Sequence, residues 1–512
     1  MYVLRGFSGI EVKWAAIVIF AFLASAAGAS AQDSPMFRND LQHTGRSASE
    51  VPMDNTIFWS FKTGDFVYAS PAVVNGRVYF GSKDYMVYSI DENTGDLIWK
   101  YQTGDGVHSS PAVVDGKVYI GSNDTKIYCL DAEDGEFLWS YKTESEVYSS
   151  PAVSNGKVYV SSNDKNVYCL NAGNGELLWT FKAGSYLYSS PAVAYGRVFL
   201  GSYENEVYCL DEDTGDLIWN FTTGGSVYSS PAIADGKVFV GAYDGKVYSL
   251  SAENGTMLWS FQTGSAISSS PALSNGRVYI GSGDEKVYCL NAVNGALLWS
   301  FATGSAVHSS PTVADGRFVV VGSYDYKVYC LEAENGGLIW SYKTGNLVHS
   351  SPAVVNGKVF VGSYDGKVYG FGETDFAIEV RPSSGSVVRG ENITATVSVS
   401  VIGSEKVTLS ATGAPSDTSV EFTPPFGIKS FSSTMVITTS PTTPEGTYTL
   451  TITGTNAGKV RTAAYVLKVG PPISIRDLTL LIILAALVVG TALVLISRRR
   501  ARKKPRFALR LE

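Results

Sequence analysis

The chain has 512 residues, of which 45% are hydrophobic and 17% charged, and its net charge is −7. This composition excludes an intrinsically disordered protein, and the length allows two or three domains. Residues 498–512 hold eight Lys or Arg and one Glu, a net charge of +7, which leaves −14 for the rest. Such an acidic chain repels phosphate backbones, so we expect no nucleic-acid partner.

The N-terminal residues are typical of a secretory signal peptide. Arg5 and Lys13 precede an apolar run, and the small residues at 29–31 fit a cleavage site. We therefore predict a signal peptide over residues 1–31, followed by a leader segment over residues 32–55.

The central part of the chain repeats with a period of 40 residues, interrupted by one insertion near residues 319–321. Each copy carries one Trp, at positions 59, 99, 139, 179, 219, 259, 299 and 340. Each copy also carries a Ser-Pro pair, with proline at 71, 111, 151, 191, 231, 271, 311 and 352. A fixed period of this length is typical of solenoids and propellers.

Each copy contains four β-favouring runs separated by turn residues such as Asn75-Gly76 and Asp134-Gly135. Four short antiparallel strands per repeat predict one propeller blade. Proline tolerates only an edge position, so the Ser-Pro run should be the innermost strand and the Trp run the outermost. We expect Leu97, Ile98, Trp99 and Tyr101 to fill both faces of such an outer strand, between neighbouring blades.

The array does not begin and end at blade boundaries. It enters with a lone Trp run, Thr56–Lys62, and its last copy stops after a third run, Lys367–Phe371. We therefore predict that Thr56–Lys62 completes the blade that begins at Ser350 and closes the ring, because closure removes exposed sheet edges. The expected fold is all-β: an eight-bladed propeller over residues 56–372.

The repeating unit, SSPAVxxGKVYxGSxDxKVYCLDAxxGxLLWSFKTG, resembles the pyrroloquinoline-quinone (PQQ)-like propeller repeat. PMFRNDLQHTGRS, at 35–47, resembles the leader that often precedes such arrays, and the resemblance covers about 35–372. It implies either a quinone-dependent alcohol or sugar dehydrogenase, which binds PQQ over a calcium ion, or a non-catalytic scaffold of the BamB-like branch or a sensor domain. A fold hosts many activities, so the choice depends on the site.

The sequence lacks the features that the dehydrogenase branch implies. No two cysteines are adjacent, the 40-residue spacing leaves no room for pocket-building insertions, and no Asp or Glu breaks the repeat at the inner end of a blade. We therefore predict no catalytic residue and no cofactor; PQQ with calcium belongs only to the alternative, a dehydrogenase.

One position of the repeat varies informatively, the residue immediately before Ser-Ser-Pro. We expect its rings to crown one mouth of the channel, where they either contact a peptide, glycan or small ligand or simply fill the channel. The candidate ligand- or partner-binding residues are Tyr68, His108, Tyr148, Tyr188, Tyr228, His308 and His349, with Ser268 in the remaining copy. We assign no metal site, because His108 lies two blades from His349.

Other repeated residues are interpreted structurally. The five cysteines share one slot of the third run, too far apart for disulfides, and should be buried thiols. They are Cys129, Cys169, Cys209, Cys289 and Cys330. The Trp series should pack between blades, and acidic turns such as Asp211–Asp216 lack the closing Glu of an EF-hand and should be hairpin turns.

The C-terminal part predicts a stalk and an anchor. Residues 375–470 lose the 40-residue period and alternate like the strands of an Ig-like β-sandwich. Residues 478–496 are uncharged and long enough to cross a bilayer, and the basic tail at 497–512 should be cytoplasmic. Sequons that fit glycosylation on the outside stand at Asn123, Asn254 and Asn392, with a less suitable one at Asn220.

The sequence therefore favours a single-pass membrane protein with its N-terminal ectodomain at the cell surface or in the periplasm. We expect a non-enzymatic scaffold for envelope organisation, assembly or adhesion, with protein or glycan partners at the propeller face. The alternatives are a PQQ-dependent dehydrogenase and an extracellular ligand sensor.

Overall fold

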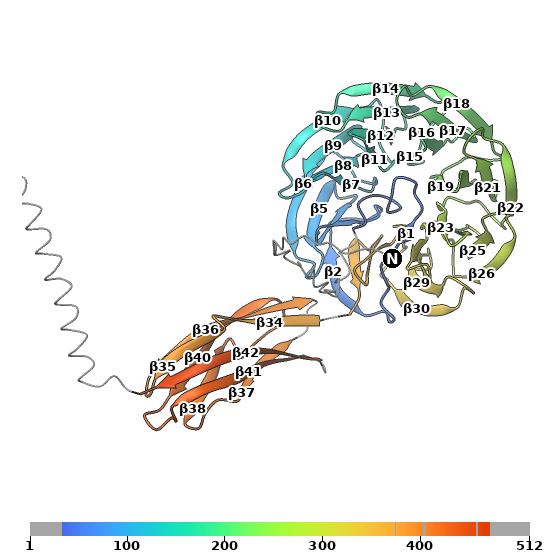
Figure 1. Cartoon of the computed structure of the whole chain (residues 1–512). Coiled ribbons are helices and arrows are strands. Elements are labelled where there is room, and N and C mark those ends of the chain that lie inside the picture. The colour runs from blue at the N-terminus through green and yellow to red at the C-terminus, as the bar shows by residue number, and fades with distance from the viewer. Residues whose placement is uncertain (1–32, 374, 403–405, 457–458, 472–512) are drawn as a thin grey trace, which may run out of the picture.

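The computed structural model describes residues 33–373, 375–402, 406–456 and 459–471 (Figure 1). Within these ranges no helix is long and apolar enough to cross a membrane. The predicted signal peptide (1–31), span (478–496) and tail (497–512) lie outside the described residues and stay predictions.

Eight antiparallel sheets of the Trp repeat stand in a ring around a central channel (Figure 1), so the predicted β-propeller is confirmed. We number the blades in chain order, and each consists of four strands of its own. The innermost strands are β3 (Ala72–Val74), β7 (Ala112–Val114), β11 (Ala152–Ser154), β15 (Ala192–Ala194), β19 (Ala232–Ala234), β23 (Ala272–Ser274), β27 (Thr312–Ala314) and β31 (Ala353–Val355). The second strands are β4 (Arg77–Gly81), β8 (Lys117–Gly121), β12 (Lys157–Ser161), β16 (Arg197–Gly201), β20 (Lys237–Gly241), β24 (Arg277–Gly281), β28 (Phe318–Gly322) and β32 (Lys358–Ser363).

The outer half of each blade carries the Cys slot and the Trp. The third strands are β5 (Met86–Asp91), β9 (Lys126–Asp131), β13 (Asn166–Asn171), β17 (Glu206–Asp211), β21 (Lys246–Ser251), β25 (Lys286–Asn291), β29 (Lys327–Glu332) and β33 (Lys367–Phe371). The outermost strands are β6 (Leu97–Gln102), β10 (Phe137–Lys142), β14 (Leu177–Lys182), β18 (Leu217–Thr222), β22 (Met257–Gln262), β26 (Leu297–Ala302), β30 (Leu338–Lys343) and, in blade 8, β2 (Ile57–Lys62).

The ring closes as predicted. Strand β2 pairs antiparallel with β33, from Ile57 opposite Phe371 to Lys62 opposite Lys367. The N-terminal strand thus supplies the fourth strand of a blade whose other three strands come from the end of the array. Phe58 and Trp59 of this strand are buried, with 1% and 7% of their surface exposed.

Each Trp joins one blade to the next. The indole Nε1 of Trp99 donates to the carbonyl of Ala132 at 3.1 Å, and the same bond recurs around the ring. At the end of the array Trp340 donates instead to Pro52, in the segment before β2, at 2.8 Å. Gly135 has φ +76° and lies under the Trp99 ring, where an added Cβ would come within 2.7 Å of the indole. The predicted packing of Trp between blades is confirmed.

One expectation about the outer strand is wrong. Leu97 and Ile98 both face solvent, 45% and 39% exposed, and equivalent pairs are exposed in most blades. The cause is a β-bulge: Leu97 lies opposite Ile90 and Trp99 opposite Ser89, so Ile98 is an extra residue. The bulge breaks the strict alternation of faces, which leaves Trp99 inside and both preceding residues outside.

The leader runs through the channel, which the sequence did not indicate (Figure 1). Its backbone bonds to the innermost strands of several blades, partly as strand β1 (Arg46–Ser47), parallel to β27. The carbonyls of Pro35, Leu41, Gln42, Thr44 and Gly45 accept from the amides of Val113, Val193, Ile233, Leu273 and Val313 at 2.7–2.9 Å. The buried Arg38 guanidinium donates to the carbonyls of Pro311 and Pro271 at 2.5 and 2.8 Å.

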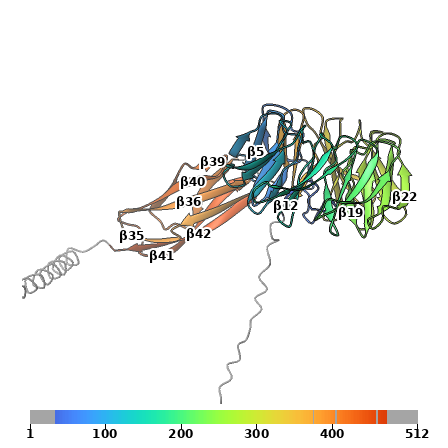
Figure 2. The ribbon, with the colours of Figure 1, turned by 90° about the horizontal axis from the view of Figure 1, so that it is seen from above.

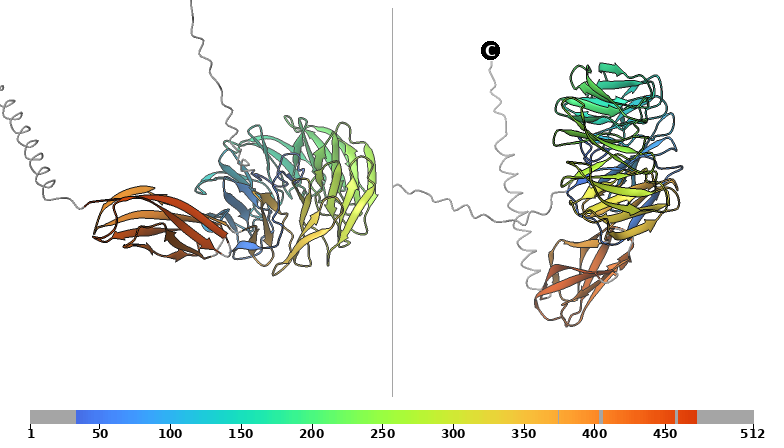
Figure 3. Two further views of the ribbon diagram at one scale, coloured as in Figure 1. Left: turned by 60° about the horizontal axis from the view of Figure 1, so that its bottom comes forward. Right: turned by 90° about the vertical axis from the view of Figure 1, so that its right-hand side faces the viewer.

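Residues after the propeller form a second domain of two packed sheets (Figures 2 and 3). One sheet has the order β34 (Asp375–Arg381), β36 (Asn392–Ile402), β40 (Phe431–Thr439), β38 (Thr418–Thr423). The other has the order β35 (Ser384–Val388), β42 (Lys459–Gly470), β41 (Gly446–Asn456), β37 (Val407–Thr412), β39 (Phe426–Gly427). Their facing sides bury Val397, Met435, Leu450 and Tyr465 completely. An ion pair between Lys429 and Asp96 of blade 1 links the two domains.

Candidate ligand-binding site at the channel mouth

The seven ring-bearing candidate residues lie together around one mouth of the channel, and we call them the collar. Each stands just before an innermost strand, so the repeat places one side chain per blade at the axis. Neighbouring rings contact each other: the centroid of Tyr68 lies 4.2 Å from His349 and 4.9 Å from His108. The series continues through Tyr148, Tyr188 and Tyr228 at spacings of 4.9–5.5 Å.

The collar is interrupted at blade 6. Ser268 stands there, and its hydroxyl is hydrogen bonded to His308 Nδ1. His308 in turn lies 6.2 Å from His349, with the two rings nearly parallel.

A second row of tyrosines packs behind the collar, and sequence reasoning missed it. Tyr243 lies 4.5 Å from Tyr228, and Tyr324 lies 4.5 Å from His308. Tyr203 and Tyr364 occupy the same place in other blades. A signal was available: the residue two positions after the repeating Gly of the second strand varies from copy to copy, as the collar residue does.

The collar surrounds a cavity of about 720 Å³ on the channel axis. Its lower part is lined by the second serine of each Ser-Ser-Pro motif and by its Ala-Ser-Pro equivalent. We call this set the serine ring: Ser70, Ser110, Ser150, Ser190, Ser230, Ser270, Ser310 and Ser351. Phe37 of the leader also lines this cavity.

The serine ring is a closed circle of hydrogen bonds. The backbone N–H of Ser70 donates to the hydroxyl of Ser110 at 2.9 Å, and each serine repeats this bond to the next blade. The circle ends where it began, since Ser351 N–H donates to Ser70 at 3.0 Å. All eight side chains are buried, with at most 8% exposed.

Burial holds the collar histidines in their neutral form. It lowers the pKa of His349 to about 3, with a further contribution from His308 and His108. Burial also lowers the pKa of His308 and of His108, whose Nδ1 lies 3.0 Å from Asn123 Oδ1. The second-row hydroxyls are protonated as well, since burial raises the pKa of Tyr243 and Tyr324. At neutral pH these rings are therefore uncharged.

The cavity offers neutral donors and aromatic faces. None of the described residues that line it is Asp or Glu, and Lys83, at the solvent-exposed rim, is its permanent cation. Ca²⁺ takes six to eight oxygen ligands that include carboxylates, so these residues do not fit a calcium-held quinone. No cluster of three or more His, Cys, Asp or Glu that could hold a metal occurs in the described part of the chain.

The remaining sequence candidates lie elsewhere. The five cysteines are free and buried, as predicted, and burial raises the pKa of each thiol to about 12. Asn254 and Asn392 are exposed, whereas Asn123 lies beside the collar; glycosylation of these sites stays a prediction.

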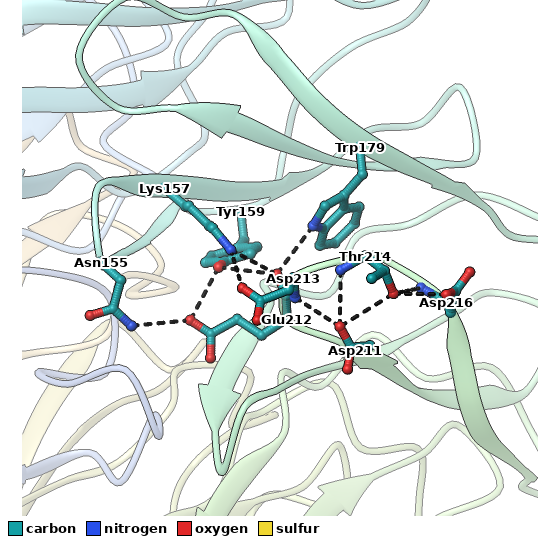
Figure 4. Close-up of polar contacts among 9 residues, drawn as sticks. All are labelled: Asn155, Lys157, Tyr159, Trp179, Asp211, Glu212, Asp213, Thr214 and Asp216. Atoms are coloured by element: carbon teal, nitrogen blue, oxygen red, sulfur yellow. Dashed lines mark hydrogen bonds and ion pairs between the residues drawn. The ribbon is translucent and has the colours of Figure 1, made fainter.

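The acidic turns are hydrogen-bonded hairpin turns (Figure 4). The Asp211 carboxylate accepts from the backbone amides of Asp213 and Thr214 at 2.9 Å. The Asp213 carboxylate pairs with Lys157 of the preceding blade at 2.5 Å. The Asp211 carboxylate therefore stabilises its own turn, and the Asp213 carboxylate links two blades.

Comparison with known families agrees with this fold. A family model described as the outer membrane protein assembly factor BamB matches residues 51–114, 86–189 and 264–407, more than half of the chain. The chain belongs to the PQQ-like β-propeller family. A model for the β-propeller of a beta-alanine-activating enzyme matches residues 154–316. No curated protein matches this chain.

Solved structures show the same fold at low sequence identity. BamB from Moraxella catarrhalis is 19% identical with a TM-score of 0.56, over 62% of this chain and all of that one. Quinohemoprotein alcohol dehydrogenase from Comamonas testosteroni is 17% identical with a TM-score of 0.59, over 67% and 80%. The computationally designed Ika8 protein is 18% identical with a TM-score of 0.56, over 63% and 100%.

Proposed function

We propose that this PQQ-like propeller is a non-enzymatic binding scaffold that captures its partner or ligand at the collar. The observation that carries the proposal is an aromatic collar around a cavity whose described lining residues include no carboxylate. Aromatic side chains with polar tips are the groups that binding surfaces favour, whereas a calcium-held cofactor needs carboxylate ligands. The similarity to BamB, an assembly factor by name, supports a scaffold.

The proposal also covers the architecture around the propeller. The eight sheets form a closed eight-bladed ring, and the two-sheet domain is an Ig-like stalk. With the signal peptide and the C-terminal span, this stalk presents the ring on the outer side of a membrane, at the cell surface or in the periplasm. Envelope organisation, assembly or adhesion, with protein or glycan partners, would fit this placement.

A quinone-dependent dehydrogenase is the second candidate, because alcohol and methanol dehydrogenases are among the similar structures. The lining of the cavity speaks against it, since a calcium ion needs carboxylate ligands that the described lining residues lack. An extracellular ligand sensor is compatible with the same collar, but its tail of 16 residues is too short to signal alone.

The collar is tested by replacing His108, His308 and His349 with serine, the residue that blade 6 already carries. We expect partners captured from native membranes by the full-length chain to be lost or weakened about tenfold. The matched control replaces Tyr195 with serine, an exposed residue of the turn between β15 and β16. Unchanged capture by the triple variant, with unchanged melting temperature, would refute a binding role of the collar histidines.

A further inference from the structure

The serine ring and the break in the collar together indicate what kind of ligand enters the cavity. We propose that the cavity binds the terminal residue of a neutral saccharide, and that the rest of the glycan leaves over blade 6. This inference rests on the proposed function, because it names the ligand class of the same site.

The serine hydroxyls are only half used. A serine hydroxyl has one proton and two lone pairs, and each hydroxyl of the ring spends one lone pair on a backbone N–H. For these eight protons no acceptor is found among the described residues. Buried polar groups nearly always have partners, so a circle of eight buried hydroxyls with uncommitted protons requires an explanation.

Sugar hydroxyls match this set of groups. Each hydroxyl of a sugar both donates and accepts, and each serine of the ring can still donate a proton and accept on its second lone pair. The circle also presents the same group from every blade. It can therefore meet hydroxyls that project from all sides of a pyranose ring, whichever edge of the ring descends first.

The charge of the lining favours a neutral ligand. Lys83 at the rim is the lining residue with a permanent charge, and burial keeps the three collar histidines uncharged. A carboxylate or phosphate that descended past Lys83 to the serine ring would lose its hydration without gaining an ion pair, which is costly in a buried site. A positively charged ligand would find no carboxylate among the described lining residues. A neutral sugar avoids both penalties.

The collar supplies the apolar surface that a sugar needs. One face of a pyranose presents C–H groups, which pack favourably on the negative faces of aromatic rings. Tyr148, Tyr188 and Tyr228 form a continuous arc along one side of the mouth. Phe37 adds an aromatic ring from the leader. The cavity volume of about 720 Å³ is sufficient for one or two sugar residues.

Blade 6 leaves the wall open. Ser268 stands where seven blades carry a ring, and Gly283 stands where the second row carries Tyr, Asn or Lys. No other copy has small residues at both positions. From these small residues we infer a notch in the mouth on this side, through which a longer glycan can extend away from the channel.

The repeat provides variants that suit the fold. Ser268→Tyr fills the notch with the residue that four blades carry, and Tyr188→Ser opens the collar with the residue of blade 6. We propose calorimetric titration of the full-length chain in detergent. The probes are mono- and tetrasaccharides of glucose, galactose, mannose and N-acetylglucosamine, and the same sugars ending in a uronic acid.

We expect at least one neutral sugar to bind, with its uronic-acid counterpart about tenfold weaker. Ser268→Tyr should weaken the tetrasaccharide about tenfold and leave the monosaccharide unchanged, whereas Tyr188→Ser should weaken both. Melting curves report whether each variant is folded.

Three results would overturn the inference: no neutral sugar binds, the acidic sugars bind better, or Ser268→Tyr weakens mono- and tetrasaccharides equally. If no sugar binds but capture of a protein still depends on His108, His308 and His349, the saccharide inference fails alone. If both are lost, the proposed function fails as well.

Discussion

At the scale of single residues, each position of the repeat has one structural role in every blade. The positions whose residue type changes from copy to copy indicate the candidate site. The Trp position holds the same residue in every copy and the Cys position holds Cys, Ser or Gly, and both form the interior between blades. The collar position alternates between Tyr, His and Ser and lines the cavity. Variation against a uniform background was therefore a usable signal for the site, although only one of the two variable rows was recognised from the sequence.

The collar histidines predict a pH dependence of stability. The pKa of His349 is lowered to about 3 in the folded chain, so the unfolded chain, with a pKa near 6.5, binds a proton first as the pH falls. The stability that the buried, neutral side chain of His349 provides is fully present above pH 6.5 and is lost between pH 6.5 and about 3. We expect the free energy of unfolding to fall by about 1 kcal/mol per pH unit between pH 6 and pH 4 through this residue.

The comparison of His349→Tyr with the parent chain checks this, by denaturant unfolding across that pH range. Tyr occupies the same position in four blades, so the variant should fold. Buried His43 also has a pKa lowered to about 3 and leaves a residual slope in both proteins. Identical slopes in the two proteins would contradict the expected role of His349.

At the scale of elements, strand order and ring closure followed from the sequence, whereas two features did not. The proline and Trp positions identify the innermost and outermost strands. The run at residues 56–62 has no partner within its own repeat, which predicts that it pairs with the last copy, as β2 does with β33. The exposure of Leu97 and Ile98 was missed, because a bulge depends on pairing register and leaves no mark in the periodicity. The leader was missed because most of its bonds to the blades are made by backbone groups, which every sequence has.

Closure by β2 predicts that the N-terminal segment holds the ring together. Deleting residues 32–64 behind the signal peptide exposes the edge of β33 and removes Phe58 and Trp59, whose burial is worth roughly 4 kcal/mol together. We expect a melting temperature lower by about 10 °C or more, measured by circular dichroism.

A matched deletion of residues 33–45 keeps β2 and removes most of the leader. It should lower the melting temperature less than the longer deletion does. Equal melting temperatures for the longer deletion and the full-length chain would show that β2 does not close the ring.

At the scale of the whole molecule, the fold is shared by BamB and by quinohemoprotein alcohol dehydrogenase, so the site decides between a scaffold and an enzyme. The described collar and serine ring combine aromatic faces with neutral hydroxyls, and the described lining residues include no carboxylate that could hold calcium. The uniform spacing of the sequence favoured a scaffold over an enzyme, and that choice stays a prediction. It did not predict the serine circle, which forms only when eight copies meet around one axis.

The central claim is that the channel mouth binds and does not catalyse. The most direct test is titration of the full-length chain with PQQ in the presence of calcium, followed by absorbance of bound quinone and dye-linked oxidation of alcohols and sugars. We predict no stoichiometric quinone uptake and no oxidation above the rate of a heat-denatured control. Uptake of one quinone per chain with substrate-dependent dye reduction, both abolished by collar substitutions, would contradict the account.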